Sequence, residues 1–157
     1  MQPIEEISEV LKQKKLKLGV AESCTGGALS NAITDIPGAS QFFVLGVIAY
    51  SQEAKKEVLG VNPETIEKHG VVSPEVAGEM AQNVKKLAKA DVGISTTGFA
   101  SPGEGVPEDK VGLVYIGICA RNLTVVGKKF SGERVEIKNA VVNYAIKKLL
   151  IIIKKEF

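Results

Sequence analysis

Blocks of hydrophobic and polar positions along the chain predict helices and strands in turn. Ile4, Ile7 and Leu11 recur at helical spacing among charged residues, so the first block predicts a helix. Residues 16–21 then become largely apolar, as in a strand that enters a buried sheet. Residues 28–33 return to helical spacing. The chain is therefore expected to open with a helix, a strand, a glycine-containing turn and a second helix.

Two further apolar blocks predict strands, and the segment between them predicts helices. Residues 42–50 are dominated by Phe, Val, Leu and Ile, which predicts a central strand covered on both faces. Residues 91–98 predict a third short strand. Between them, helices are expected to start at Ser51, which suits an N-cap, and after Asn62 and Ser73, each followed by a proline suited to the first helical position.

The last third of the chain predicts a hairpin and a closing helix. Residues 111–120 and 123–130 are strand-like and are joined by two residues that suit a tight turn, so one strand is expected to be antiparallel. The closing helix follows residues 131–134, and its apolar side is expected to comprise Val135, Ile137, Val141, Val142, Ala145, Ile146, Leu149 and Leu150. The order of elements indicates an α/β domain with helices on both faces of a mixed sheet.

Composition and charge narrow the class of protein. The chain has 157 residues, 45% hydrophobic and 24% charged, which favours one globular domain over residues 1–157. A formal net charge of +2 gives no reason to expect a nucleic-acid partner, and the longest apolar run is far shorter than the ~20 residues of a membrane span. Two cysteines and no secretory signal favour a cytoplasmic location.

Histidine is almost absent, which limits the available chemistry. His69 is the single histidine and lies in a charged stretch typical of a solvated helix end. No cluster of Cys, His, Asp or Glu has the spacing of metal ligands, so no metal and no cofactor is expected. A nucleophilic site would need a base other than imidazole.

Candidate chemistry gathers where the predicted strands end, because open α/β sheets bind ligands at the carboxyl ends of their strands. Polar residues and glycines follow three of these strands, and an arginine opens the closing helix within reach of the same rim. The candidate site residues are Ser23, Thr25, Gly26, Gly27, Tyr50, Lys55, Thr97, Gly98 and Arg134.

Each candidate also has a purely structural interpretation. A hydroxyl within residues 23–27 can simply cap the following helix. Lys55 lies in a charged run typical of a solvated helix face, and Tyr50 at a strand end is typical of packing. Thr97 can cap the loop that follows it, and Arg134 can form a surface ion pair.

The combination points to a serine nucleophile without histidine. Lys55 can accept the serine proton if burial or nearby positive charge lowers its pKa towards ~7–8. Tyr50 can relay or donate a proton, and backbone amides around Thr25 and Gly26 can stabilise an oxyanion. Arg134, with the glycine-containing turn, would recognise a phosphate.

Seven strings of the sequence run in order over nearly the whole chain. They are residues 21–27 (AESCTGG), 33–40 (ITDIPGAS), 50–55 (YSQEAK), 59–61 (LGV), 69–73 (HGVVS), 97–100 (TGFA) and 130–134 (FSGER). Together they resemble the C-terminal domain of the competence/damage-inducible protein CinA family. The resemblance implies a three-layer α/β/α sandwich with a mostly parallel mixed sheet that contains an antiparallel strand.

For active members, the resemblance implies a nicotinamide-nucleotide amidase that converts nicotinamide mononucleotide to nicotinate mononucleotide and ammonia in pyridine-nucleotide salvage. By motif, Ser23 matches the nucleophile, Lys55 the base and Tyr50 its partner, while Thr97 and Arg134 match residues of the substrate site. The partner expected from this is a small-molecule nucleotide, without nucleic acid or membrane. The apolar rim of the closing helix favours a homo-oligomer, a dimer or higher.

Three features depart from the family pattern. Members often read Gly-Ile-Ala-Gly-Pro-Gly where this chain has Phe99 and Ser101, and Lys138 stands where an arginine is common. The frequent N-terminal domain, which resembles molybdopterin-binding proteins, has no counterpart in these residues, so the chain resembles the stand-alone form. The alternative hypothesis is a catalytically silent domain with a nucleotide-binding or regulatory role.

Overall fold

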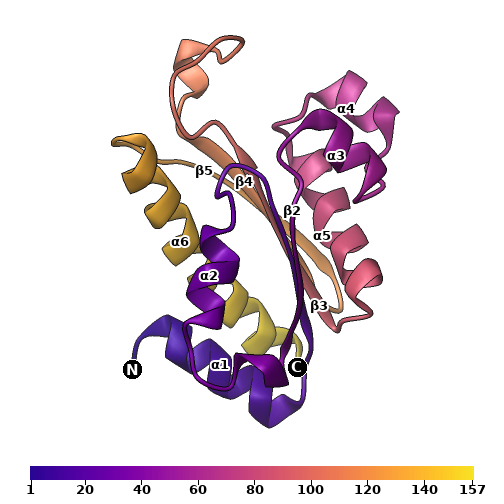
Figure 1. Ribbon diagram of the computed structural model, residues 1–157, viewed down its shortest axis with the longest axis vertical. Helices are drawn as coiled ribbons and strands as arrows, with labels where there is room; N and C mark the ends of the chain where they lie inside the picture. The colour runs from indigo at the N-terminus through magenta and orange to yellow at the C-terminus, as the bar shows by residue number, and fades with distance from the viewer.

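The computed structural model describes residues 1–157, with helices on both sides of a twisted five-stranded sheet (Figure 1). In chain order the elements are α1 (Pro3–Lys14), β1 (Leu18–Glu22), α2 (Ala28–Thr34), η1 (Ala39–Gln41), β2 (Phe43–Ile48), α3 (Gln52–Glu57), α4 (Pro63–His69), α5 (Pro74–Ala88), β3 (Val92–Gly98), η2 (Glu108–Lys110), β4 (Leu113–Cys119), β5 (Leu123–Lys129) and α6 (Arg134–Glu156).

The sheet has the order β2-β1-β3-β4-β5. Strand β1 is parallel to β2 and β3, whereas β4 is antiparallel to both β3 and β5. Four strands therefore point one way and β4 alone points the other way, which confirms the predicted mixed sheet. Helices α1, α2 and α6 cover one face and α3, α4 and α5 cover the other, so the three-layer α/β/α sandwich is also confirmed (Figure 1).

The three predicted helix starts after β2 are confirmed with their capping groups. Ser51 Oγ accepts a hydrogen bond from the amide of Ala54 at 3.0 Å. The side chains of Asn62 and Ser73 cap α4 and α5 in the same way, and a proline follows each of them. Since these caps satisfy amides that would otherwise lack partners, local sequence is sufficient to set where the three helices begin.

Helix α5 packs unusually close to the sheet because glycines face it from neighbouring strands. A Cβ atom on Gly93 of β3 would lie 2.2 Å from the carbonyl oxygen of Ala81, and one on Gly117 of β4 would lie 2.4 Å from that of Ala77. The larger hydrophobic core fills the opposite side, between the sheet and α1, α2 and α6.

Strand β2 lies at the edge of the sheet, so the prediction of a central strand at residues 42–50 is wrong. Its side chains alternate between half-buried and exposed positions, and Val44 and Ile48 are among the exposed ones. Helix α2 is only seven residues long and leaves part of this edge uncovered. Continuous apolar sequence thus marks a strand here but does not place it within the sheet.

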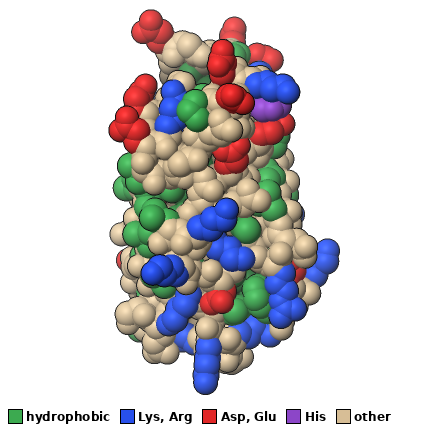
Figure 2. Space-filling model, turned by 90° about the vertical axis from the view of Figure 1, so that its right-hand side faces the viewer, with side chains coloured by type: hydrophobic (Ala, Val, Ile, Leu, Met, Phe, Trp, Pro, Cys, Tyr) green, Lys and Arg blue, Asp and Glu red, His purple; other side chains and the backbone are tan.

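Two further observations concern the outer surface. Val135 is exposed at the start of α6, so its predicted place among the inward-facing side chains is wrong, whereas the other seven predicted positions are buried. Figure 2 shows acidic side chains gathered at the end of the molecule that carries α3 and α4, and lysine and arginine side chains towards the opposite end. No helix combines the length and apolar character needed to cross a membrane.

Candidate active site

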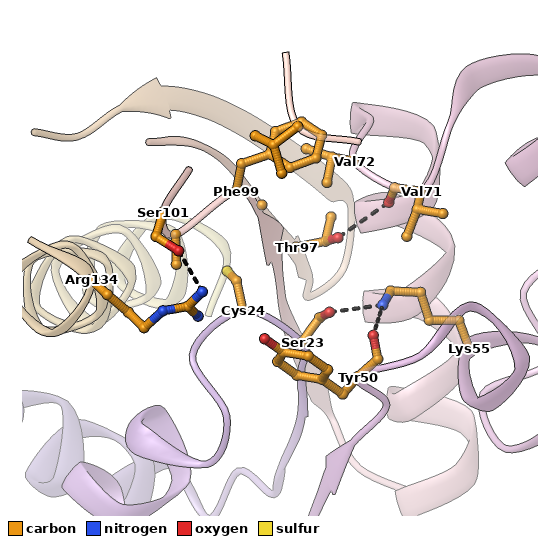
Figure 3. A pocket seen from close by; sticks show the side chains of 13 residues that line it. Ser23, Cys24, Tyr50, Lys55, Val71, Val72, Thr97, Phe99, Ser101 and Arg134 are labelled. Atoms are coloured by element: carbon orange, nitrogen blue, oxygen red, sulfur yellow. Dashed lines mark hydrogen bonds between the residues drawn. The ribbon is translucent and has the colours of Figure 1, made fainter. Parts of the chain in front are cut away.

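A cavity of about 250 Å³ opens at the rim of the sheet where β1 and β3 end. Six of the nine sequence candidates line it, although they come from distant parts of the chain (Figure 3). They are Ser23, Tyr50, Lys55, Thr97, Gly98 and Arg134. The expectation that these residues share one rim is therefore confirmed as a matter of geometry.

A buried hydrogen bond in the cavity joins Lys55 to Ser23. Lys55 Nζ lies 2.7 Å from Ser23 Oγ and donates to the backbone carbonyl of Tyr50 at 2.9 Å (Figure 3). It also donates to the backbone carbonyl of Ala49 at 3.0 Å. The lysine side chain has 0% of its surface exposed. The interpretation of Lys55 as a solvated surface residue is wrong.

Burial changes the acidity of this lysine. Removal from water disfavours the charged ammonium and lowers the pKa of Lys55 from 10.5 to about 8. Carbonyl oxygens can only accept hydrogen bonds, so in the neutral amine the two N–H groups are held by Ala49 and Tyr50. The remaining lone pair then faces Ser23 Oγ, which is the geometry of a base ready to accept a proton.

Ser23 begins the turn between β1 and α2, and the turn holds it through backbone contacts. Its amide donates to the carbonyl of Thr96 at 3.1 Å, and Thr25 Oγ1 lies 2.7 Å from Thr96 Oγ1. The N-cap residue of α2 is Gly27, which has no side chain that could cap the helix. The interpretation of a hydroxyl in residues 23–27 as a simple N-cap is therefore wrong.

Thr25, Gly26 and Gly27 do not line the cavity around Ser23. Thr25 is fully buried, and the two glycines border a separate open hollow of about 750 Å³ that also includes Lys138. The Gly26 amide donates to the carbonyl of Ser23 at 3.1 Å, so it is engaged within the turn. The amides of Cys24 and Thr25, by contrast, donate to no acceptor within the protein.

The other cavity residues differ in how firmly they are held. Thr97 is buried and its hydroxyl donates to the carbonyl of Val71 at 3.2 Å, so it does not merely cap the following loop. Arg134 forms a hydrogen bond from its guanidinium to Ser101 Oγ and takes part in no ion pair (Figure 3). Tyr50 is 60% exposed, so it is not a packing residue, and its ring lies beside Ser23 at the mouth of the cavity.

Sequence reasoning missed several residues of the cavity wall. Val71 and Val72 come from the short connection before α5, and Phe99 and Val106 come from the loop after β3. Apolar residues in connections carry no local signal that distinguishes a binding wall from ordinary packing. They give the cavity an apolar wall, and Figure 3 shows Phe99 and Val72 across the cavity from Ser23.

Cys24 also lines the cavity, next to the serine, and its position raises the question of a competing nucleophile. Burial raises the pKa of the Cys24 thiol to about 12. The thiolate is therefore negligible near neutral pH, and the Lys55 amine bonds to Ser23 and not to the Cys24 thiol. No group of three or more His, Cys, Asp and Glu side chains lies close enough together to hold a metal ion.

Comparison with known proteins identifies the family to which the chain belongs. The profile of the family described as the CinA C-terminal domain matches residues 2–153. The chain belongs to the CinA family. A protein of Thermoanaerobacter pseudethanolicus, provisionally named competence-damage inducible, is 50% identical over 143 residues, which cover 90% of this chain and 35% of the relative. The chain thus spans about a third of the length of the curated relatives it matches.

Solved structures of CinA proteins share the fold across nearly their whole length. Competence damage-inducible protein A from Klebsiella pneumoniae superposes with a TM-score of 0.93 at 30% identity, covering 99% of this chain and 97% of that one. The competence/damage inducible protein CihA from Agrobacterium tumefaciens superposes with a TM-score of 0.84 at 34% identity, covering 98% and 97%. The family resemblance expected from the seven sequence strings is confirmed.

Proposed function

We propose that this CinA domain is an amidohydrolase that converts nicotinamide mononucleotide to nicotinate mononucleotide and ammonia. One observation carries the proposal: a fully buried lysine lies 2.7 Å from a serine hydroxyl, and two backbone carbonyls hold its other hydrogens. This arrangement activates a serine without histidine. The apolar wall with Phe99 and the basic Arg134 across the cavity suit an aromatic carboxamide joined to a phosphate.

The reaction begins when neutral Lys55 accepts the proton of Ser23. Ser23 Oγ attacks the carboxamide carbon, and the carbonyl electrons move to its oxygen to form a tetrahedral oxyanion. The Lys55 ammonium then gives its proton to the amide nitrogen, and ammonia leaves as the oxyanion collapses to an ester on Ser23. Water, deprotonated by Lys55, attacks this ester, and the proton returned to Ser23 Oγ frees the carboxylate product.

Other groups of the rim support both steps. The unpartnered amide of Cys24, which lines the cavity, is a candidate to donate to the oxyanion, and it directly follows the nucleophile, as in other serine hydrolases. The Tyr50 hydroxyl at the cavity mouth can relay the Lys55 proton, because it can give its own proton to the leaving nitrogen and take the one from the Lys55 ammonium. Arg134 would turn from Ser101 to the substrate phosphate.

Purified protein mixed with nicotinamide mononucleotide tests the proposal, with ammonia release and nicotinate mononucleotide followed in parallel. Ser23→Ala and Lys55→Met should each lower kcat/KM by on the order of 10³-fold or more. The matched controls are Ser40→Ala, an exposed serine away from the cavity, and Lys56→Met, the neighbouring lysine. Unchanged turnover in Ser23→Ala would rule out the serine mechanism.

The second candidate function is a nucleotide-binding domain without turnover. It is favoured by the hydrogen bond between Ser101 and Arg134, because an arginine held by the protein is less available to a substrate phosphate. Calorimetry with the same nucleotide separates the two functions. Binding without ammonia release would support the silent domain, and it would contradict the amidase.

A further inference from the structure

Glu22 is a charged residue buried beside the proposed nucleophile, and neither the reaction nor the cavity uses it directly. It is the last residue of β1, immediately before Ser23, and 0% of its surface is exposed. No lysine, arginine or histidine pairs with its carboxylate. A buried carboxylate without a cation is costly unless hydrogen bonds hold it, so its partners indicate its role.

The carboxylate of Glu22 accepts three hydrogen bonds, all from two residues in the first turn of α2. The amides of Leu29 and Ser30 donate to its two oxygens at 2.8 and 3.0 Å, and Ser30 Oγ donates at 2.7 Å. These amides are among those that a helix leaves without a partner at its start, and Gly27 at the N-cap has no side chain to satisfy them. Glu22 therefore ends the strand and caps the helix at the same time.

The nucleophile lies between the two points that Glu22 joins. Residues 23–27 form the turn from β1 to α2, and the carboxylate fixes the separation of its ends. On its other side the turn is tied to β3 through Thr25 and Thr96. These contacts at both ends of the turn favour a fixed place for Ser23 relative to α3, which carries Lys55, and to the carbonyls of Ala49 and Tyr50 that hold the amine.

Strand β2 is shaped to leave room for this contact. A Cβ atom on Gly46 would lie 2.7 Å from Ser30 Oγ, the hydroxyl that donates to Glu22. Only glycine at this position lets Ser30 keep its hydroxyl on the carboxylate. Residues from three elements, β1, α2 and β2, thus meet in one arrangement.

We infer that Glu22 is a positioning residue which, with Ser30 and Gly46, holds Ser23 at hydrogen-bonding distance from Lys55. This inference rests on the proposed function in that it takes Ser23 as the nucleophile. Since a displacement of about 1 Å in a reacting group can cost on the order of 10²-fold in rate, Glu22→Gln is expected to lower kcat by about that factor. The variant keeps the shape of the side chain but offers one acceptor oxygen where the carboxylate has two.

Three readouts test the positioning role, and the third, a rate constant of labelling, does not depend on how much of the protein is folded. KM should stay within about threefold of the parent, because Glu22 does not line the cavity. The midpoint of the pH profile should not move, since the lowered pKa of Lys55 arises from burial. Labelling of Ser23 by a fluorophosphonate, which needs no nucleotide, should slow in parallel with kcat.

Two milder variants keep the test decisive if Glu22→Gln folds poorly. Ser30→Ala removes one hydrogen bond of the carboxylate, and Gly46→Ala displaces the same hydroxyl, so each should slow labelling by about tenfold. The matched control is Ser95→Ala, which loses a buried hydroxyl bonded at 2.6 Å to Ala77 and should leave the labelling rate unchanged.

Crystal structures of these variants make the outcome independent of the proposed function. The expected result is a Ser23 Oγ displaced beyond hydrogen-bonding distance from Lys55 Nζ. Labelling rates within twofold of the parent, or a fall equal to that of Ser95→Ala, would overturn the inference. If the parent shows neither turnover nor labelling, the amidase proposal fails, and an unmoved Ser23 in the variant crystals would overturn the positioning role separately.

Discussion

Lys55 has no exposed surface and three hydrogen-bond partners, although its sequence neighbours resemble those of any surface lysine. It lies between Ala54 and Lys56 in a short run rich in charge. Nothing local distinguishes Lys55 from Lys56, because the difference arises from where α3 sits over the ends of the strands. At the scale of a residue, the environment rather than the residue type decides that Lys55 can act as a base.

The pH dependence of activity follows from this environment. Only the neutral amine can accept the Ser23 proton, and the pKa of Lys55 is lowered to about 8, so the neutral fraction grows as the pH rises through that value. We expect kcat/KM to increase about tenfold per pH unit below 8 and to level off above it. A pH profile of kcat/KM for nicotinamide mononucleotide, with protein stability checked at each pH, measures this.

A flat profile from pH 6 to 9 would contradict the role of Lys55 as base. The direction in which kcat/KM changes with pH is also informative. A basic group that must be charged to act would give activity that falls as the pH rises through its pKa. Lys56→Met serves as the control, since it removes a neighbouring charge without touching Ser23. Its profile should keep the same midpoint.

At the scale of elements, the packing of helix α5 on the sheet depends on glycines of neighbouring strands that all face this helix. Gly19, Gly93 and Gly117 lie on three neighbouring strands, and a Cβ atom on each would lie within 3.0 Å of an atom of α5. The close approach is what lets α5 contact several strands at once. It places the start of this helix, and with it Val71 and Val72, beside the cavity.

Gly93→Ala is expected to destabilise the fold by about 2–3 kcal/mol, because its Cβ atom would lie 2.2 Å from a backbone oxygen that cannot turn aside. Urea unfolding measures the change. The control is Gly103→Ala in the loop after β3, where the added Cβ would be 3.9 Å from its nearest neighbour and the expected change is within about 0.5 kcal/mol. Equal midpoints for the two variants would contradict the packing argument.

At the scale of the whole molecule, one end of the sheet carries the cavity and the other end carries a hairpin turn bound by α6. The cavity lies where β1 and β3 end, while the β4–β5 turn lies at the other end, because Cys119 pairs with Gly93 and Tyr115 with Thr97. There the carboxylate of Glu156 accepts the amides of Arg121 and Asn122 at 2.8 and 3.0 Å. The end of α6 thus fastens the hairpin.

Glu156→Ala should lower the free energy of unfolding by about 1–2 kcal/mol, because two amides of the turn lose their acceptor. Turnover should not change, since the contact is at the far end of the sheet from Ser23. Thermal unfolding and the ammonia assay measure the two quantities on the same samples. Glu9→Ala, an exposed glutamate of α1 without polar contacts, is the control, and a loss of turnover in Glu156→Ala alone would show that the ends are coupled.

The sequence by itself determined the type and order of the elements. The spacing of hydrophobic residues, the capping side chains and the prolines influence structure over only a few residues. The helices after Ser51, Asn62 and Ser73 and the hairpin at Arg121 could therefore be predicted. The rule that open α/β sheets bind ligands at the carboxyl ends of their strands placed Ser23, Tyr50, Lys55, Thr97 and Arg134 on one rim, and the family strings added the expected roles.

Only the tertiary structure decided which surfaces of these elements are covered and which side chains touch. It placed β2 at the edge of the sheet, left Thr25 and the two turn glycines outside the cavity, and set the carboxylate of Glu22 on the start of α2. The physical reason is that burial and hydrogen bonding depend on neighbours brought from far along the chain. The local sequence pattern does not identify those neighbours. It therefore cannot predict the lowered pKa of Lys55 or the contacts that hold Ser23 beside it.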